Sequence, residues 1–324
     1  MKVIVDTDVG IDDALALIFL SACKEVEIIA VTLVQGNAEI ETITSNIEGI
    51  FTFLGEKSIP IYKCGVYNMA GKGTFKKGNL VKNDGYFGSN ALGGINLPHQ
   101  NVTACDKMSS VEALIHYSKI YPKEIHSIFI GPLTNLALAT LIDNKFASRL
   151  ASILIMGSDR SELKTEPKQE EFNARSDALA YKILKKCISP LDTQVTIVDR
   201  ATCSSSLLPF SLIDELKVIK SRKYKPSKHI DLFDIFTNKN NKYIKKSYLE
   251  GGLLIADLLV AVGSIFPRVF TKYQRAFITK VEILGENCGR VTFQNHSDGN
   301  VNLVTEINTE ELSKIIVDTL SIQN

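Results

Sequence analysis

Four aspartates stand close together near the start of the chain, in the stretch VIVDTDVGIDDALALIF from Val3 to Phe19. They are Asp6, Asp8, Asp12 and Asp13, and most of the residues around them are apolar. Carboxylates this close repel one another and raise each other's pKa unless a cation compensates. Because the cluster offers only oxygen donors, with no Cys or His nearby, it suits Ca²⁺ or Mg²⁺ better than zinc.

The spacing of the aspartates indicates where the cluster lies. Asp6 and Asp8 share one face of a strand, since strand side chains alternate, and Gly10 then permits a turn into a helix. Asp12 and Asp13 could serve as a helix cap and a partner of the helix dipole, but capping does not explain the strand aspartates. A dinucleotide turn is disfavoured because the negative charge would repel phosphate. Open α/β sheets bind ligands at the carboxyl ends of strands, so we expect a cation site there.

Elements that would position this cluster follow from the hydrophobic pattern, in which short Val/Ile-rich runs alternate with stretches of helical period. This alternation predicts βαβ units around a mainly parallel sheet. The expected strands are Val3–Val5, Val26–Val34, Ile59–Tyr62, Ile125–Ile130, Ala151–Met156 and Val195–Val198. The expected helices are Asp12–Ser21, Ile43–Leu54, Ser109–Tyr121, Leu133–Ile142, Asp177–Cys187 and Phe210–Lys220.

The C-terminal part has a different pattern. A small antiparallel elaboration is expected from the runs Ala276–Leu284, Val291–Gln294 and Val301–Ile307, followed by a last helix over Thr309–Ile322. Three polar or glycine-rich stretches are expected to be long loops or lids: Ala70–Asn96, Gly157–Glu171 and Arg222–Tyr248. Without internal repeats or a low-complexity linker, residues 1–324 are expected to form a single α/β domain.

Composition narrows the class of protein. Hydrophobic residues make up 45% and charged residues 23%, and the formal net charge is +1, which gives no general reason to bind nucleic acid or an anionic membrane. No window reaches the ~18 apolar residues of a membrane span. The six cysteines form no Cys-x-x-Cys pair, and Asp6 and Asp8 interrupt any signal-like apolar run. We therefore expect a cytoplasmic protein with reduced thiols.

The stretch DTDVGIDDALAL resembles the signature of the nucleoside hydrolases, the inosine-uridine preferring nucleoside N-ribohydrolases. Further similarities follow in order along nearly the whole chain: VTLVQGN at 31–37, ALGGINLP at 91–98, GPLTNLAL at 131–138, LIMG at 154–157, EEFNARSDALA at 170–180 and IADLLVA at 255–261. The resemblance implies a largely parallel α/β fold with Ca²⁺ at the strand ends. It also implies hydrolysis of the N-glycosidic bond of a ribonucleoside, and family members are commonly homodimers or homotetramers.

The same resemblance implies a role for each matching residue. Ca²⁺ would be held by Asp8, Asp13, the main-chain carbonyl of Thr134, and Asp257, and Asp8 would also be the general base for the attacking water. The ribose hydroxyls would be bound by Asp12, Asn37, Glu171 and Asn173, with Met156 lining the sugar pocket and Asp6 in support.

Elementary chemistry agrees with these roles. Glycosidic cleavage passes through an oxocarbenium-like centre that carboxylates can stabilise, and a cation can orient two vicinal hydroxyls and a water. The site should therefore reject 2′-deoxynucleosides, because polar groups would be left unpaired. An acid such as Asp257 in a leucine-rich helix is costly unless it is paired, and a metal would pair it.

The resemblance is incomplete where the base would lie. Phe87 stands where the family often has His, and Ala256 stands before Asp257 where the family has His or Trp. The polar loop before EEFN also lacks the usual Gly-Asn that contacts the ribose 5′-hydroxyl. Stacking on aromatic residues is therefore the expected contact to the base, with purines slightly favoured; the candidates are Tyr86, Phe87, Tyr243 and Tyr248, with His229 as a candidate acid or a solvated loop residue.

Two other functions fit parts of the pattern. A ribonucleoside- or ribose-binding protein of the same fold would have lost efficient catalysis together with the missing acid. A phosphatase of the haloacid dehalogenase type would use Asp6 as nucleophile, Asp8 as acid or base, and Mg²⁺. The phosphatase reading leaves Asp12, Asp13 and Asn37 unexplained.

Overall fold

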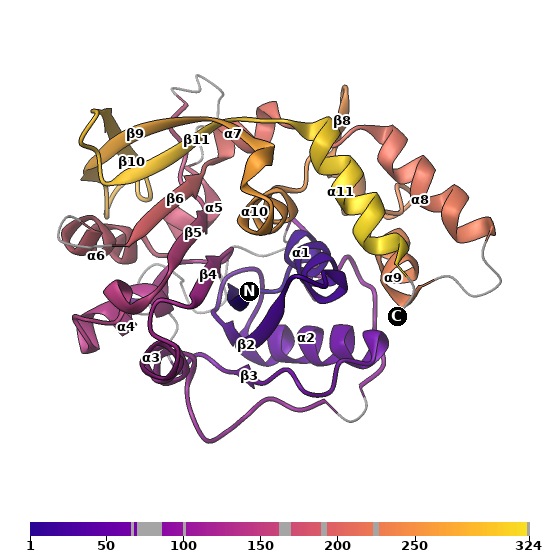
Figure 1. Cartoon of the computed structure of the whole chain (residues 1–324), viewed down its shortest axis with the longest axis horizontal. Helices are drawn as coiled ribbons and strands as arrows, with labels where there is room; N and C mark the ends of the chain where they lie inside the picture. Colours follow the sequence, from indigo (N-terminus) through magenta and orange to yellow (C-terminus); the bar gives the residue numbers. More distant parts are fainter. Residues whose placement is uncertain are drawn as a thin grey trace.

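A twisted central sheet with helices on both faces organises the chain (Figure 1). The structure, a computed structural model, describes residues 1–65, 68–69, 86–99, 102–161, 170–188, 193–222 and 227–322. Within these ranges nine strands form one sheet in the order β10-β9-β11-β6-β5-β4-β1-β2-β3. The strands from β3 to β6 are parallel, and β11 adds in parallel to β6 before β9 and β10 continue antiparallel.

The strands alternate along the chain with the helices that cover them. The strands of the sheet are β1 (Lys2–Thr7), β2 (Glu27–Leu33), β3 (Ile61–Tyr62), β4 (Ile125–Phe129), β5 (Ser152–Met156), β6 (Gln194–Val198), β9 (Phe270–Val281), β10 (Val291–Asn295) and β11 (Val301–Ile307). A separate hairpin pairs β7 (Tyr248–Leu249) with β8 (Gly252–Leu253). The predicted α/β fold with a C-terminal antiparallel elaboration is thus confirmed.

Two layers of helices cover the sheet. One layer, packed on the face that includes Val3 and Val5, contains α1 (Ile11–Ala22), α2 (Ile40–Leu54), α8 (Phe210–Arg222), α9 (Lys228–Phe236), α10 (Ala256–Ile265) and α11 (Thr309–Ser321). The opposite layer, packed on the face that includes Ile4, contains α3 (Ser110–Ile120), α4 (Thr134–Ile142) and α6 (Ala178–Ile188). Alternate residues of β1 therefore enter two different cores, as the strand period requires.

Short elements complete the chain between these layers. They are α5 (Phe172–Ser176), α7 (Arg200–Ser205) and the 3₁₀ turns η1 (Ala147–Arg149), η2 (Ile244–Ser247) and η3 (Pro267–Val269). Most predicted elements lie within a few residues of the observed ones, although β3 is only two residues long and β9 begins six residues before its predicted start. No helix in the described ranges is long and apolar enough to cross a membrane.

The prediction that Arg222–Tyr248 forms a long loop was wrong where Lys228–Phe236 forms helix α9. Ser227 caps α9 by accepting a hydrogen bond from the amide of Ile230. Ile230, Phe233 and Phe236 are buried against the core, at the spacing of one helix face. Residues 223–226 of that expected lid lie outside the described residues, as do residues 70–85 and 162–169 of the other two.

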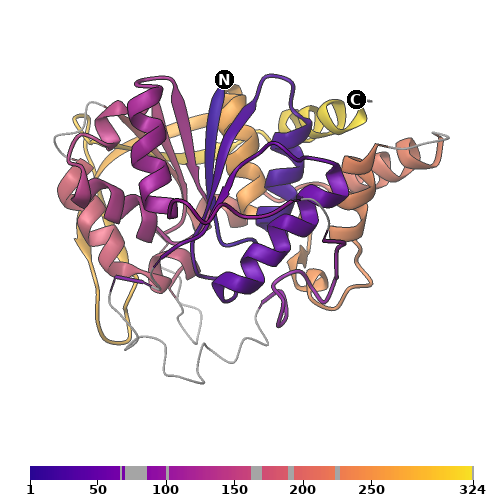
Figure 2. The same cartoon turned by 90° about the horizontal axis from the view of Figure 1, so that it is seen from below.

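The parallel strands run away from the N-terminus, so their carboxyl ends form the edge of the sheet at the bottom of Figure 2. Asp8, Asn37 and Glu171 follow β1, β2 and β5 at this edge. Segments 86–99 and 238–247, far apart in the sequence, lie side by side below it. The fold therefore brings the predicted site residues to one end of the sheet.

Candidate active site and cation site

Asp8 is buried at the carboxyl end of β1, where its carboxylate fits between two glycines. Its Oδ2 accepts a hydrogen bond of 2.6 Å from the main-chain amide of Asn37. A Cβ on Gly36 would lie 2.0 Å from the same oxygen, and a Cβ on Gly131 would lie 3.3 Å from Oδ1. A side chain at Gly36 would displace the carboxylate, and one at Gly131 would collide with Val34 at 2.6 Å and crowd Asp8, so both glycines belong to the architecture of the site.

The turn between β1 and α1 is strained and is held by Asp13. Val9 has a φ of 39°, a left-handed conformation that is rare for a β-branched residue. Asp13, fully buried, accepts hydrogen bonds from the hydroxyl of Thr7 and from the amide of Gly10 at 2.8 Å. The side-chain amide of Asn37 donates to the same carboxylate at 3.3 Å. Strain that persists in this way is characteristic of functional sites.

Asp257 joins the aspartates of α1 from the first turn of α10. Carboxylate oxygens of Asp12, Asp13 and Asp257 lie within 4.8 Å of one another. Helices α1 and α10 pack side by side, which brings residues more than 240 positions apart to one point. The structure thus confirms that Asp257 lies with the N-terminal cluster rather than on the surface.

Electrostatics make this cluster unstable without a counter-charge. Burial first, and then the charge of Asp13, raises the pKa of Asp8 well above its usual range and that of Asp12 to about 7. Burial, followed by the charges of Asp12, Asp13 and Asp8, also raises the pKa of Asp257 well above its usual range. None of the ion pairs among the described residues includes a member of the cluster. A bound cation would supply the missing positive charge.

The donor set fits a hard cation. It consists of carboxylate oxygens of Asp12, Asp13 and Asp257 that are close together, with Asp13 and Asp257 buried and Asp12 half-buried, and no cysteine or histidine belongs to the group. Thr134, the first residue of α4, is also buried at this edge, and its hydroxyl donates to Asp177 at 2.7 Å. That bond turns the side chain of Thr134 toward Asp177, and its main-chain carbonyl is a cation ligand only in what the family resemblance implies.

Asp6 lies behind the cluster and is held by its own partners. Its Oδ2 accepts hydrogen bonds from Thr32 Oγ1 at 2.6 Å and from Asn135 Nδ2 at 2.7 Å. The residue is 1% exposed, and burial raises the pKa of its carboxyl group to about 7. The phosphatase alternative would use Asp6 as the nucleophile and would leave the nearby group of Asp12, Asp13 and Asp257 without a role.

The other side of the site is built around Glu171, which caps the short helix α5. One carboxylate oxygen of Glu171 accepts from the amide of Asn173, and the other accepts from Ser158 and Ala174, all at 2.8–2.9 Å. The side-chain amide of Asn173 donates to the carbonyls of Ile130 and Met156, at the ends of β4 and β5. Glu171, Asn173 and Met156 are therefore positioned together, as the sequence predicted.

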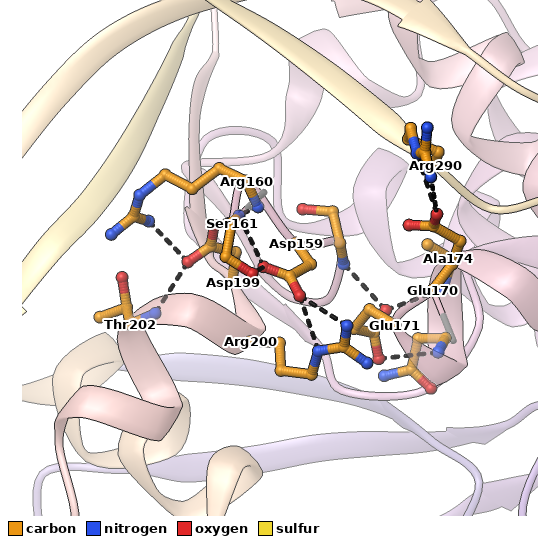
Figure 3. A network of polar contacts seen from close by, with 12 residues as sticks. Asp159, Arg160, Ser161, Glu170, Glu171, Ala174, Asp199, Arg200, Thr202 and Arg290 are labelled. Carbon is orange, nitrogen blue, oxygen red and sulfur yellow. Dashed lines mark hydrogen bonds and ion pairs between the residues drawn. The ribbon is translucent and has the colours of Figure 1, made fainter. Parts of the chain in front are cut away.

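Three arginine–carboxylate pairs surround Glu171 (Figure 3). Arg160 pairs with Asp199 at 2.6 Å, Arg200 with Asp159 at 2.6 Å, and Arg290 with Glu170 at 2.8 Å. Burial raises the pKa of Glu171, whereas its amide hydrogen bonds and the charge of Arg200 act in the opposite direction. Sequence reasoning missed this network, because nothing in the local pattern links residues 159–171, 199–200 and 290.

A group of aromatic side chains packs against the turn between β1 and α1, next to the acidic cluster. A Cβ on Gly10 would lie 3.0 Å from the Phe87 ring, so this ring packs directly on the turn after Asp8. The Tyr86 ring meets Phe87 edge-on, and the Asp12 charge adds to burial in raising the pKa of Tyr86. The Tyr243 ring contacts Gly88. Three of the predicted base-contacting residues are thus brought together.

The remaining two base-contact candidates are not brought to the cluster. The Tyr248 hydroxyl donates to the carbonyl of Thr237, and its ring stacks on Phe210. His229 is 7% exposed in the first turn of α9, next to Lys228, whose ammonium lies against Gly55 at the far end of α2. Because α2 starts at the carboxyl edge of the sheet, its far end lies at the amino edge. The placement of His229 therefore does not favour a role as the acid.

Comparison with known families now adds to this geometry. The profile of the inosine-uridine preferring nucleoside hydrolase family matches residues 3–314, and the chain belongs to this family. The curated relatives include a probable uridine nucleosidase 2 of Arabidopsis thaliana, 26% identical over 98% of this chain and 97% of that protein. Uridine nucleosidase 1 of the same plant is 34% identical, over 48% of this chain and 44% of its own length.

Solved structures agree on the fold. A plant nucleoside hydrolase superposes with a TM-score of 0.81 and 23% identity over 99% of both chains. A purine-preferring ribonucleoside hydrolase from Gardnerella vaginalis superposes with a TM-score of 0.81 and 21% identity, over 99% of this chain and 98% of that one. At these identities the superpositions establish the nucleoside hydrolase fold. Together with family membership, the curated relatives support a nucleoside N-ribohydrolase.

Proposed function

We propose that the protein hydrolyses the N-glycosidic bond of ribonucleosides to ribose and free base, with a Ca²⁺ ion as cofactor. The observation that carries this proposal is the all-oxygen group of Asp12, Asp13 and Asp257 at the carboxyl edge of the sheet, with the buried Asp8 near enough to feel the charges of Asp13 and Asp12, in a chain of this family. Asp8, Asp13, Asp257 and the main-chain carbonyl of Thr134 would hold the ion. When bound, a Ca²⁺ ion binds vicinal hydroxyls and orients a water molecule for attack.

Each of the site residues would then have a defined role in the reaction. Asp8 accepts the proton of the attacking water, because it is buried near the charges of Asp13 and Asp12 and the main-chain amide of Asn37 holds its Oδ2 in place. Asp12 and Asn37 bind the sugar from the β1 and β2 side. Glu171 and Asn173 bind it from the β5 side, and Met156 closes the apolar wall between them. Negative charge on both sides stabilises the oxocarbenium-like transition state.

The base would lie against Tyr86, Phe87 and Tyr243. A purine presents more ring surface to these side chains than a pyrimidine does, so we infer a slight preference for purine ribonucleosides. The names of the relatives include uridine nucleosidases and a purine-preferring enzyme, so they support ribonucleosides as the substrate class without choosing the base. A comparison of kcat/KM for inosine and uridine tests this preference, and a ratio favouring uridine would overturn it.

Replacement of Asp8 tests the mechanism. Asp8→Asn keeps the shape of the side chain but removes the base, so turnover of inosine should fall by at least about 10³-fold. The exposed Asp298 offers a matched control, since Asp298→Asn makes the same chemical change far from the cluster. Circular dichroism should show that both variants are folded. Full activity of folded Asp8→Asn would contradict the mechanism.

The absence of a histidine or tryptophan before Asp257 leaves a binding protein as the second candidate. Ala256 precedes Asp257, and the described residues around Tyr86 and Phe87 place no histidine there. A p-nitrophenyl riboside needs no acid, because its leaving group is already stable as an anion. Hydrolysis of this riboside supports the enzyme, whereas tight ribose binding without hydrolysis of any riboside would favour the binding protein.

Two further features belong to the proposal. We infer that the protein acts in the cytoplasm, which the six free cysteines support. Assembly as a homodimer or homotetramer rests on the resemblance to the family, and light scattering on the purified protein tests it.

A further inference from the structure

Two segments meet at the side of the site where the base would lie. Segment 86–97, part of the stretch 86–99 described above, contains no helix or strand. Segment 238–247 connects α9 to β7. The side-chain amide of Asn241 donates to the carbonyl of Gly93 at 2.9 Å, and the Tyr86 and Ser247 hydroxyls are 3.3 Å apart. A Cβ on Gly88 would lie 2.8 Å from the Tyr243 ring. Contacts along their length therefore fix the two segments to each other (Figure 2).

The joint between these segments adjoins the sugar-binding residues. Phe87 packs on Gly10. The side-chain nitrogen Nδ2 of Asn37 lies 2.5 Å from the position that a Cβ on the same glycine would take. The charge of Asp12 is close enough to Tyr86 to contribute to the raised pKa of that hydroxyl. A base attached to a sugar held by Asp12 and Asn37 would therefore project toward this joint.

Lys246 places a positive charge at this joint. Its ammonium group lies 5.9 Å from the centroid of the Tyr86 ring and 5.8 Å from that of the Tyr243 ring. Lys242 lies over the Tyr243 ring at 4.7 Å and, within the described part of the chain, over no second ring. Among the described residues Lys246 takes part in no ion pair, so its charge is not neutralised by a neighbouring carboxylate there. One ammonium is thus shared by the two rings that would flank the base.

A cation at this place could stabilise the departing base, for which the sequence offers no histidine or tryptophan before Asp257. When the C1′–N bond breaks, the electron pair moves to the nitrogen of the base, which leaves as an anion unless a donor meets it. We propose that Lys246 is the specificity-determining donor that stabilises the departing base, in the place of a histidine or tryptophan before Asp257. The inference rests on the proposed hydrolysis of ribonucleosides.

The atoms and protons of the hydrolysis are accounted for by water, Asp8, the base and Lys246. The oxygen of a water molecule bonds to C1′ and its proton passes to Asp8. The base accepts a hydrogen bond and then a proton from the Lys246 ammonium, which recovers a proton from solvent. Only stabilisation that is stronger in the transition state than in the ground state lowers the barrier, as with charge that develops on the departing base. The effect of Lys246 should therefore grow as the leaving base becomes a poorer anion.

Substitution of Lys246 with a matched control tests the proposal. Lys246→Met keeps the length and apolar stem of the side chain but removes the charge, and Lys242→Met makes the same change on the neighbouring lysine. Both variants and the wild type are assayed with inosine, uridine and p-nitrophenyl riboside. Lys246→Met should lower kcat/KM for the two nucleosides about 10²-fold and change the nitrophenyl substrate less than about twofold. Lys246→Arg keeps the charge and the hydrogen-bond donor but does not release a proton, so it should restore only part of the loss.

The outcomes separate this proposal from the proposed function. Unchanged nucleoside hydrolysis in Lys246→Met, or an equal loss in Lys242→Met, overturns the role of Lys246. An equal loss on nucleosides and on the nitrophenyl riboside also overturns it, because a leaving-group donor acts on the poor leaving group only. Failure of the wild type to hydrolyse even the nitrophenyl riboside would instead reject the proposed hydrolase.

Discussion

The sugar end and the base end of the site are built in different ways. At the sugar end, carboxylates are buried on strand ends and first helical turns, and main-chain amides hold them in place. At the base end, two irregular segments meet, Tyr86 is 49% exposed, and one of the joining hydrogen bonds spans 161 residues. Under the proposed function, the sugar end, held by buried hydrogen bonds, would perform the chemistry, and the exposed loops would select the base.

This comparison predicts that changes to the sugar affect turnover more than changes elsewhere in the substrate. 2′-Deoxyinosine lacks one of the hydroxyls that the sugar end would bind, so its kcat/KM should be at least about 10³-fold below that of inosine. 5′-Deoxyinosine is the matched control and should lose less, because the sequence offers no Gly-Asn to bind the 5′-hydroxyl. Equal losses with the two deoxynucleosides would contradict a site organised around the 2′,3′-diol.

A smaller effect is expected from the arginine network that supports Glu171. Arg290 pairs with Glu170, and a Cβ on Gly289 would lie 2.5 Å from the main chain of Arg175 in α5, so this turn packs against the helix that carries Asn173. Arg290→Met should raise KM for inosine about threefold to tenfold, because Glu171 and Asn173 are positioned less well. Arg290→Lys should recover part of this loss.

The matched control for Arg290 is Arg268, which forms an exposed ion pair with Glu311 at 3.0 Å. Arg268→Met removes the same kind of interaction at a distance from the site, and kinetics should be unchanged. Equal kinetics for wild type and Arg290→Met would show that the network has no part in positioning the sugar.

The smallest expected effect concerns the stability of the metal-free protein. Burial raises the pKa of Asp6 and of Asp12 from 3.8 to about 7. A carboxyl group with a raised pKa in the folded state stabilises the fold below its unfolded pKa, and this stability is lost as pH rises from about 4 to about 7. The Tm in EDTA should therefore fall by about 2–5 °C between pH 5 and pH 8. Added Ca²⁺ should abolish the fall, and a Tm that rises with pH in EDTA would contradict the electrostatic description.

Much of the sugar end was predictable from the sequence because its signals are local. The run from Asp6 to Asp13 contains a strand, a turn and a helix start, and their periods place the carboxylates without tertiary information. Burial of Asp257 could be inferred because an acid in an apolar helix needs a partner. The observed contacts among Asp12, Asp13 and Asp257 agree with that reasoning.

The base end could not be predicted in the same way. Helix α9 was missed because its apolar residues lie within a lysine-rich, aromatic stretch that is typical of a loop. The roles suggested for His229 and Tyr248 depended on that loop, and the helix places them elsewhere. The position of Lys246 depends on contacts between segments 86–97 and 238–247, which leave no local pattern in the sequence.

Calorimetric titration of the metal-free protein with Ca²⁺ tests the central claim most directly. Wild type should bind one ion per chain, and Asp257→Asn should lose most of that affinity while the protein remains folded, because the substitution removes one charge from the cluster. The predicted result is therefore a single saturable site that depends on Asp257. No binding to the wild type, or equal binding to both proteins, would contradict the account.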